Sequence, residues 1–339
     1  MRTPPDKAEV IRRLEVIFEN ITDTLLANTA VLVRILELVH EALSADVVIT
    51  KRDIYYRHPA LFVKQAVVDR YVDDIACAFG VPRLSLNVAA AAKGLVVGGF
   101  TCRRGDGTVL EGLSDREGLL IPNVNLTDRF RLSRVSWILV VEKEATFRSL
   151  ASSNFWDTLV SSGIMITAKG YPDVATRTFL RAISTPSPQN GFRCAPVYAL
   201  MDYDPDGIAI MSTYKYGSFA LAHENTKLVV PQMGWLGIRS SVLPSCAAAL
   251  TESSNHGNED ANGESNVHQV QGLLRLTTRD RRKALKMLEW DVFAENGPEP
   301  RWRMEFQVML MLNVKAEIQI MEAQTGGLAG WLQAELNGL

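Results

Sequence analysis

Three acidic side chains stand at positions where they could bind a metal ion. Glu142 follows the apolar run 138–141, and Asp202 and Asp204 come at the end of the apolar run 197–201. If the two runs are neighbouring parallel strands, their carboxyl ends meet at one edge of a sheet and bring the carboxylates together. Carboxylate oxygens suit hard cations such as Mg²⁺. The spacing fits a simple turn equally well, because Asp-Pro-Asp-Gly is favourable turn chemistry.

A tyrosine among basic residues is the second candidate for chemistry. Residues 51–57 read Lys-Arg-Asp-Ile-Tyr-Tyr-Arg. Because only about one phenol in a thousand is ionised at neutral pH, a nucleophilic tyrosine needs nearby cations that stabilise its phenolate. Arg52 and Arg57 could supply that charge. The alternative is that Tyr55 and Tyr56 are packed aromatic residues with hydrogen-bonded hydroxyls, and these residues alone do not decide between the two.

The composition is that of an ordinary globular protein with room for two domains. Of 339 residues, 47% are hydrophobic and 22% charged, and the formal net charge is -2. This balance excludes DNA binding by bulk charge, so any such binding must use local patches such as residues 51–104, with nine basic and four acidic side chains. The sequence has no long apolar run and no signal-like start, so we expect no membrane span and no secretion. The four scattered cysteines are read as reduced packing residues.

Hydrophobic patterning divides the chain into a helical part and an α/β part. The first part is predicted to contain helices and then a strand with its turn: 8–43, 53–56, 66–79, 84–92, 95–101 and 103–108. Helices followed by a small β wing are typical of a winged-helix module, which places a helix in a DNA groove. From about residue 135, buried strands alternate with helices and predict a parallel α/β sheet. We therefore expect segments 1–40 (variable, helical), 41–110 (winged helix), 111–134 (linker) and 135–339 (α/β domain with a C-terminal extension).

Two further polar stretches are of interest. Residues 251–266 contain no apolar residue larger than alanine and are predicted to form a surface loop. His256 and His268 have no partner cluster there and are read as surface residues rather than metal ligands. The run Arg-Asp-Arg-Arg-Lys at 279–283 is either a nuclear import signal or a charged helix face, and the second interpretation is favoured.

Ordered segments resemble the eukaryotic meiotic double-strand-break transesterases, a family homologous to the A-type chain of archaeal topoisomerase VI. The likeness extends in the same order from about residue 40 to the end, which makes it highly specific. The segments that carry it are 51–56 (KRDIYY), 85–94 (SLNVAAAAKG), 141–147 (VEKEATF), 164–170 (IMITAKG), 202–207 (DYDPDG), 214–218 (YKYGS), 235–237 (WLG) and 315–318 (KAEI). Asp206 departs from the family pattern, which leaves its role open.

The resemblance implies a winged-helix domain followed by a Toprim-type parallel α/β domain. It also implies attack on DNA by Tyr56, leaving the 5′ end bound to the protein. The implied roles are catalytic for Tyr56, Arg52 and Lys169, DNA-binding for Lys51, Arg57 and Lys93, and Mg²⁺-binding for Glu142, Asp202 and Asp204. The expected partners are double-stranded DNA, a second copy at cleavage, a partner resembling the B subunit of topoisomerase VI, and accessory meiotic proteins. The expected location is the nucleus.

Other functions fit parts of this pattern. The A subunit of a topoisomerase VI would cut and then rejoin DNA with an ATPase partner. A DNA-binding scaffold that has lost its catalysis is disfavoured, because Tyr56 and the three acids are all present. A Toprim nuclease or primase without a tyrosine intermediate would leave Tyr56 unexplained.

Overall fold

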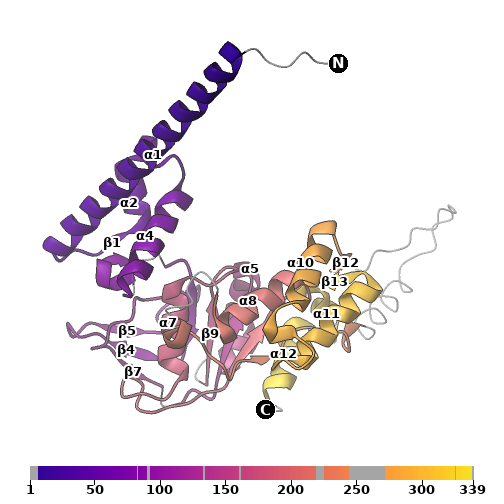
Figure 1. Cartoon of the computed structure of the whole chain (residues 1–339). Coiled ribbons are helices and arrows are strands. Elements are labelled where there is room, and N and C mark those ends of the chain that lie inside the picture. The colour runs from indigo at the N-terminus through magenta and orange to yellow at the C-terminus, as the bar shows by residue number, and fades with distance from the viewer. Residues whose placement is uncertain are drawn as a thin grey trace, which may run out of the picture. The chain divides into compact units, whose positions relative to one another are not determined.

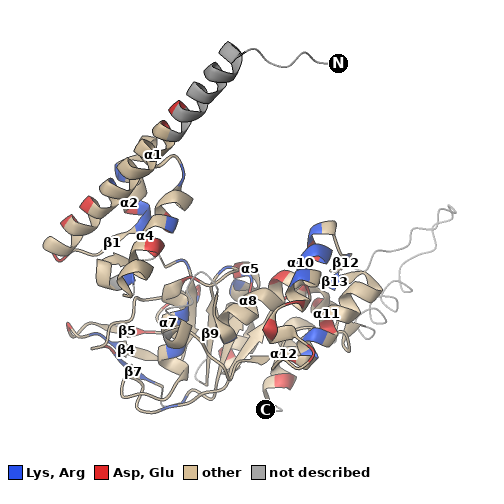
Figure 2. Cartoon of the chain, viewed as in Figure 1, with Lys and Arg blue, Asp and Glu red and all other residues tan. Residues whose placement is uncertain are grey.

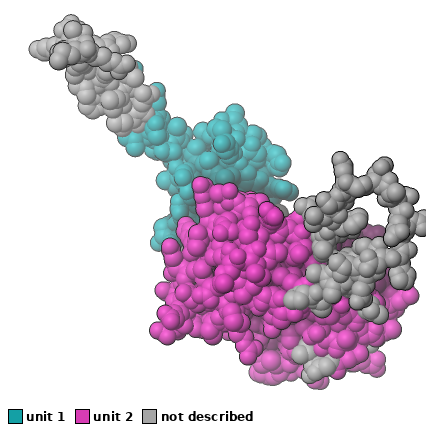
Figure 3. Space-filling model, turned by 90° about the vertical axis from the view of Figure 1, so that its right-hand side faces the viewer, with its two compact units in different colours: residues 1–91 teal, residues 92–339 magenta. Residues whose placement is uncertain are grey.

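The computed structural model (Figure 1) describes residues 7–81, 83–89, 92–132, 134–159, 162–218, 225–243, 272–324 and 326–337. The chain divides into two compact units, Met1–Ala91 and Ala92–Leu339, which are distinguished by colour in Figure 3. Within the described residues, no helix has both the length and the apolar character needed to cross a membrane. The expected loop 251–266 and His268 lie outside the described residues.

Unit 1 is helical, with one short pair of parallel strands. Its elements are α1 (Lys7–Ser44), β1 (Ile49–Thr50), α2 (Lys51–Arg57), α3 (Pro59–Phe62), α4 (Gln65–Phe79), the 3-10 helix η1 (Arg83–Leu86) and β2 (Val88–Ala89). Buried residues of α1, α2 and α4, such as Ile35, Ile54 and Val68, form one core. The expected segment 1–40 is therefore not separate from the rest of unit 1, because α1 continues to Ser44 and packs into that core.

The helix expected over residues 84–92 is wrong for the described part of that range. The chain there forms only the single 3-10 turn η1 and then β2, which pairs in parallel with β1. Between them Asn87 adopts a left-handed backbone with a φ of 52°, and this conformation ends the helical run. Val88 and Ala89 are buried, so their apolar character reflects a strand in the core.

A six-stranded sheet forms the centre of unit 2, in the order β11-β10-β8-β9-β3-β6. Its strands are β3 (Leu95–Gly98), β6 (Leu119–Leu120), β8 (Trp137–Val141), β9 (Gly163–Thr167), β10 (Val197–Leu200) and β11 (Gly234–Trp235). The first four strands of that order run parallel to one another. Strand β3 pairs antiparallel with β9, and β6 pairs antiparallel with β3. Every residue of β8 and β9 is buried, as is usual for strands in the middle of an α/β sheet. The predicted parallel α/β sheet is confirmed.

Helices and smaller sheets surround this sheet within unit 2. These elements are β4 (Thr101–Arg103), β5 (Val109–Glu111), β7 (Arg129–Arg131), α5 (Glu144–Ala151), α6 (Asn154–Leu159), α7 (Val174–Ser184), α8 (Pro205–Tyr216), η3 (Asn225–Lys227), β12 (Leu273–Arg275), α10 (Thr278–Leu288), η4 (Asp291–Phe293), α11 (Pro300–Leu312), β13 (Val314–Ala316), η5 (Ile318–Ala323) and α12 (Gly327–Asn337). The C-terminal elements α10, α11, α12, β12 and β13 gather together, drawn orange to yellow in Figure 1.

The β wing expected before residue 110 belongs to unit 2 instead. The strand expected at 95–101 is β3, which pairs with β9 and β6 in the central sheet. The turn expected at 103–108 does form, since β4 and β5 make an antiparallel hairpin around it, but β7 from the expected linker completes that sheet. All of β3 is buried, so its apolar run fits a core sheet better than a solvated wing. The described residues of unit 1 contain no β hairpin.

Candidate active site

Glu142 and Asp202 meet at the carboxyl ends of two neighbouring parallel strands. Val141, the last residue of β8, pairs with Leu200, the last residue of β10. The Asp202 amide donates a 3.0 Å hydrogen bond to the Glu142 carboxylate, and the Glu142 amide donates to the Leu200 carbonyl at 3.1 Å. The adjacency expected from the two apolar runs is confirmed for this pair.

Asp204 caps the N-terminus of α8. Its carboxylate accepts a 2.7 Å hydrogen bond from the Gly207 amide, and Pro205 occupies the first helical turn, where its missing N–H is not needed. A Cβ at Gly207 would clash with the Asp202 carbonyl oxygen, so the helix can approach the acidic loop this closely only with glycine. The Asp-Pro-Asp-Gly segment thus begins helix α8 and does not form the simple turn that the sequence left open as an alternative.

The three carboxylates repel one another in a largely buried setting. Burial, followed by the charges of Asp202 and Asp204, raises the pKa of Glu142 to about 8. Burial is also the main reason why the pKa of Asp204 is raised, and the charges of Asp202 and Asp206 add to it. Positive charge placed among these side chains would relieve the repulsion.

Asp202 has a cationic partner within the protein. Lys143 Nζ lies 2.9 Å from Asp202 Oδ2 and 3.4 Å from Glu317 Oε2. The Ile318 amide donates to Asp202 Oδ1 at 2.9 Å. Burial opposes the charged form of Lys143, but its hydrogen bond to Asp202 and the two carboxylate charges outweigh burial and raise the pKa of Lys143.

The C-terminal part of the chain holds the acidic loop in place. Tyr203, which lies between two of the acids, exchanges backbone hydrogen bonds of 2.8 and 3.0 Å with Ala316 in β13. Lys143 and residues 315–318 lie in segments that carry the resemblance, but their contacts with the acidic loop were not predicted from the sequence. No local pattern reveals the contacts of residues 315–318, because they join residues more than a hundred positions apart.

The three acids are of a type that binds divalent cations, but the structure does not arrange them as a set of metal ligands. In the part of the chain that the structure describes, no group of three His, Cys, Asp or Glu side chains is placed to hold a metal ion. Protein groups hold each carboxylate instead, as described for Glu142, Asp202 and Asp204. The buried excess of carboxylates still fits a cation that prefers oxygen ligands, and these three residues are the ones that would hold it.

Lys169 lies in the loop that follows β9, and Lys93 contacts that loop. Lys169 Nζ lies 3.0 Å from Glu144 Oε2, and its backbone is left-handed with a φ of 58°. Lys93 Nζ donates to the Lys169 carbonyl at 3.4 Å. The next residue, Gly170, donates its amide to the Glu142 carbonyl at 3.0 Å. The structure thus brings both expected lysines to the acidic edge of the sheet, with the Lys169 ammonium paired to Glu144.

Tyr56 is exposed on α2 in unit 1. It is 67% exposed, whereas Tyr55 is partly buried against the unit 1 core. The two rings meet edge to face with centroids 5.4 Å apart. An open pocket of about 480 Å³ includes Tyr56 in its lining, together with Val47, Val48, Ile49, Asp53 and Arg57. A ligand in this pocket would therefore have access to the Tyr56 side chain.

The basic residues near Tyr56 have different surroundings. Arg52 is exposed and has no ion-pair partner among the described residues. Arg57 pairs with Glu41 at 3.1 Å. Lys51 is buried, with its Nζ 2.7 Å from Asp73 Oδ1, and burial lowers its pKa. Lys51 therefore ties α2 to α4, and its expected role in DNA binding stays a prediction.

Comparison with known proteins identifies the class of protein that this fold and these residues define. Residues 137–327 match the family model for the Toprim domain of Spo11 and of the topoisomerase 6 A subunit, and residues 27–88 match a model described as type IIB DNA topoisomerase. The chain belongs to this family of Spo11 proteins and topoisomerase 6 A subunits. Toprim domains in general bind a divalent metal.

Relatives with curated names cover most of the chain. It is 36% identical over 298 residues to meiotic recombination protein SPO11-1 of Oryza sativa subsp. indica, a match covering 86% of this chain and 69% of that protein. It is 33% identical over 290 residues to meiotic recombination protein SPO11 of Mus musculus, covering 86% and 66%. It is 33% identical over 297 residues to the DNA topoisomerase 6 A subunit of Arabidopsis thaliana, covering 87% and 62%.

Proposed function

We propose that this chain is a topoisomerase-like DNA transesterase that makes the double-strand breaks of meiotic recombination, with Tyr56 as its nucleophile. Membership of the family supports a DNA-cleaving transesterase, and relatives named as meiotic recombination proteins support the meiotic role. The observation that carries the choice of Tyr56 is its exposure beside an open pocket, while Tyr55 packs against the core.

The proposed reaction replaces one phosphodiester with another. The Tyr56 oxygen forms a bond to phosphorus, the bond to the deoxyribose 3′ oxygen breaks, and the phenolic proton ends on the departing oxygen. The products are a 5′ end joined to Tyr56 and a free 3′ hydroxyl. Since the bond types are the same on both sides, the step needs no nucleotide hydrolysis, and the sequence contains no G-x-x-x-x-G-K-[ST] motif. Arg52 is the exposed cation that we assign to assist near the phosphate.

We assign Mg²⁺ to Glu142, Asp202 and Asp204. The cation, when bound, would neutralise charge on the phosphate that Tyr56 attacks. The protein prepares this site through the pairing of β8 with β10 and through the cap that fixes Asp204. Lys169, released from Glu144, would add positive charge at the same edge.

The proposed assembly follows from the need to cut both strands of a DNA duplex. Two tyrosines are needed to cut both, so we propose a homodimer at cleavage. A B-type partner is proposed because similar proteins are named as A subunits of topoisomerase 6. Accessory meiotic proteins and a nuclear location follow from a meiotic role on chromosomal DNA. We assign Arg57 and Lys93 as DNA contacts in addition.

The role of a topoisomerase 6 A subunit is the second candidate function, because the identity to one such protein is 33% over 297 residues. It differs from the first in its outcome. A topoisomerase reseals the DNA and releases it, whereas a break-forming enzyme leaves the covalent product for other proteins to process.

Recovery of the chain from meiotic cells under denaturing conditions tests the proposal. DNA that remains attached after denaturation, through its 5′ ends, supports it. Breaks that form in cells where the chain carries no attached DNA would contradict it.

A further inference from the structure

Helix α10 presents an unusually basic surface. Its sequence from Thr278 to Leu288 holds five basic side chains and a single acid, Asp280. The residues Arg279, Arg281, Arg282 and Lys286 are exposed. Figure 2 shows the basic residues gathered on this helix. Like charges on one side of a helix repel one another, and a negatively charged partner would relieve that repulsion.

The one acid of α10 does not neutralise that surface. Asp280 is buried, and its carboxylate accepts from Lys315 Nζ at 2.8 Å and from the Thr277 amide at 2.9 Å. Together Thr277 and Asp280 form the capping box that starts the helix. Burial opposes ionisation, but the Lys315 and Thr277 hydrogen bonds outweigh it and lower the pKa of Asp280. Its charge therefore pairs with Lys315 and does not offset the exposed basic side chains of α10.

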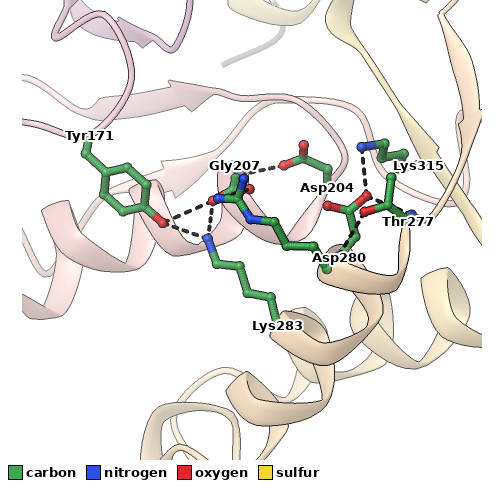
Figure 4. Close-up of polar contacts among 9 residues, drawn as sticks. Tyr171, Asp204, Gly207, Thr277, Asp280, Lys283 and Lys315 are labelled. Atoms are coloured by element: carbon green, nitrogen blue, oxygen red, sulfur yellow. Dashed lines mark hydrogen bonds and ion pairs between the residues drawn. The ribbon is translucent and has the colours of Figure 1, made fainter.

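Helix α10 is attached to the acidic loop through Asp206. Lys283 Nζ pairs with the Asp206 carboxylate and donates a 2.7 Å hydrogen bond to the Tyr171 hydroxyl (Figure 4). Asp206 lies in the first turn of α8, the helix that Asp204 caps. Both helices belong to unit 2. The N-terminal half of α10 therefore borders the candidate metal site.

Three basic side chains of α10 share one stripe of the helix. Arg279, Arg282 and Lys286 are spaced three and four residues apart, which places them along one side. Arg279 is 83% exposed, and its only ion-pair neighbour within the described residues is Asp206, 4.0 Å away. Neither Arg282 nor Lys286 has an ion-pair partner within those same residues. At 1.5 Å per residue the stripe is roughly 10 Å long, similar to about three phosphates along one DNA strand.

We propose that Arg279, Arg282 and Lys286 bind the phosphate backbone of duplex DNA beside the acidic cluster. This inference rests on the proposed function, because it makes α10 part of the surface that carries the DNA to Glu142, Asp202 and Asp204. The Lys283 and Asp206 pair gives α10 its position without using the stripe. Asp206 thereby acquires a role that the family pattern left open.

The alternative interpretation of residues 279–283 as an import signal fits the structure less well. Arg281 donates to Asn313 at 2.6 Å, and Lys283 is bound to Asp206. With Arg279, which has Asp206 4.0 Å away, three of the four basic side chains in that segment have a partner within the fold. The stripe at Arg279, Arg282 and Lys286 extends beyond the segment. Arg279 is 83% exposed with Asp206 4.0 Å away, and Arg282 and Lys286 have no ion-pair partner within the described residues.

Salt-dependent DNA binding by the full chain tests the inference. The variant Arg279→Gln/Arg282→Gln/Lys286→Gln is compared with a charge-matched control, Arg131→Gln/Arg134→Gln/Arg193→Gln, whose residues are also exposed in unit 2 and lie outside the basic patch 51–104. Affinity for a short duplex is measured by fluorescence anisotropy over a range of KCl concentrations, without Mg²⁺. Each lost phosphate contact lowers the slope of log affinity against log salt by about 0.9.

The α10 variant should lose a slope of about two to three, and the control less than one, with equal melting temperatures. An unchanged slope in the α10 variant, or an equal loss in the control, would overturn the inference. Covalent attachment of DNA to the unaltered chain, measured in parallel, separates this result from the proposed function. If the unaltered chain bound no duplex at all, both would fail.

Discussion

The Asp202 backbone amide donates a 3.0 Å hydrogen bond to the carboxylate of Glu142, and this contact joins the ends of two parallel strands. Glu142 is therefore held against the loop that carries the other two acids. Burial and those acids raise its pKa to about 8, so the side chain is mostly protonated at neutral pH in the absence of a cation. Because its pKa responds to burial and to the neighbouring acids, the protonation of Glu142 reports on the electrostatics of the site.

Glu142 should make the metal-free protein less stable as the pH rises. Its pKa is about 8 in the folded chain against 4.5 as the reference, so the folded state binds the proton more tightly between these values. The free energy of unfolding, measured with urea in the presence of a chelator, should be higher near pH 5 than near pH 8. The Glu142→Gln variant should lack this contribution.

The free energy of unfolding of the unaltered chain minus that of Glu142→Gln isolates the contribution of Glu142, because the contributions of the other titrating groups cancel. Midway between the reference pKa and the pKa in the folded chain, this difference should change by up to about 1.4 kcal/mol per pH unit. Parallel pH profiles for the unaltered chain and Glu142→Gln would show that the pKa of Glu142 is not raised.

Substitutions at Asp204 should separate its structural role from its metal role. Asn caps a helix about as well as Asp, so Asp204→Asn should keep the stability of α8 but weaken Mg²⁺ binding, because a charged ligand is lost. Asp204→Ala should lose the cap as well, at a cost of about 1 kcal/mol in the free energy of unfolding. Calorimetric titration and urea unfolding measure the two effects.

Asp206→Asn is the matched control for that experiment. Its carboxylate is paired with Lys283, so removing its charge should change Mg²⁺ affinity much less than the change at Asp204. Ala at Glu142 or Asp202 should also weaken Mg²⁺ binding. Unchanged affinity in the variants of all three acids would refute the metal assignment.

Sequence patterns predicted the central sheet and the meeting of two acids, because apolar runs that end in a charge mark where buried strands stop. They did not predict how β3 pairs. The run at β3 was compatible with a wing hairpin and with a core strand, and only its pairing with β9 decides. Burial of Lys51 and the contact of Lys143 with Asp202 and Glu317 depend on distant segments, which no local spacing reveals.

Complementation between two inactive variants tests whether the working site is shared between subunits. A Tyr56→Phe chain lacks the nucleophile, and a Glu142→Ala chain lacks one acid. If the tyrosine of one subunit works with the acids of the other, a mixed dimer has one intact site and should nick one strand. Attached DNA should be found only on the Glu142→Ala chain, which retains Tyr56.

Separately tagged chains make the mixed dimer identifiable, and each variant alone is the control. A mixed dimer that is confirmed by both tags but yields no nicked DNA would indicate that the site is completed within one chain. In that case the dimer would still be needed for two cuts but not for each single cut.

The covalent bond between Tyr56 and DNA is the step on which the proposed reaction depends, and mass spectrometry can identify the residue that forms it. Chain recovered under denaturing conditions is digested with nuclease and protease, and the peptide that retains a nucleotide is sequenced. We expect a nucleotide on Tyr56, its loss in Tyr56→Phe, and a much milder effect of Tyr55→Phe, whose side chain packs against the core. A nucleotide on Tyr55, or attachment that survives in Tyr56→Phe, would show that Tyr56 is not the nucleophile.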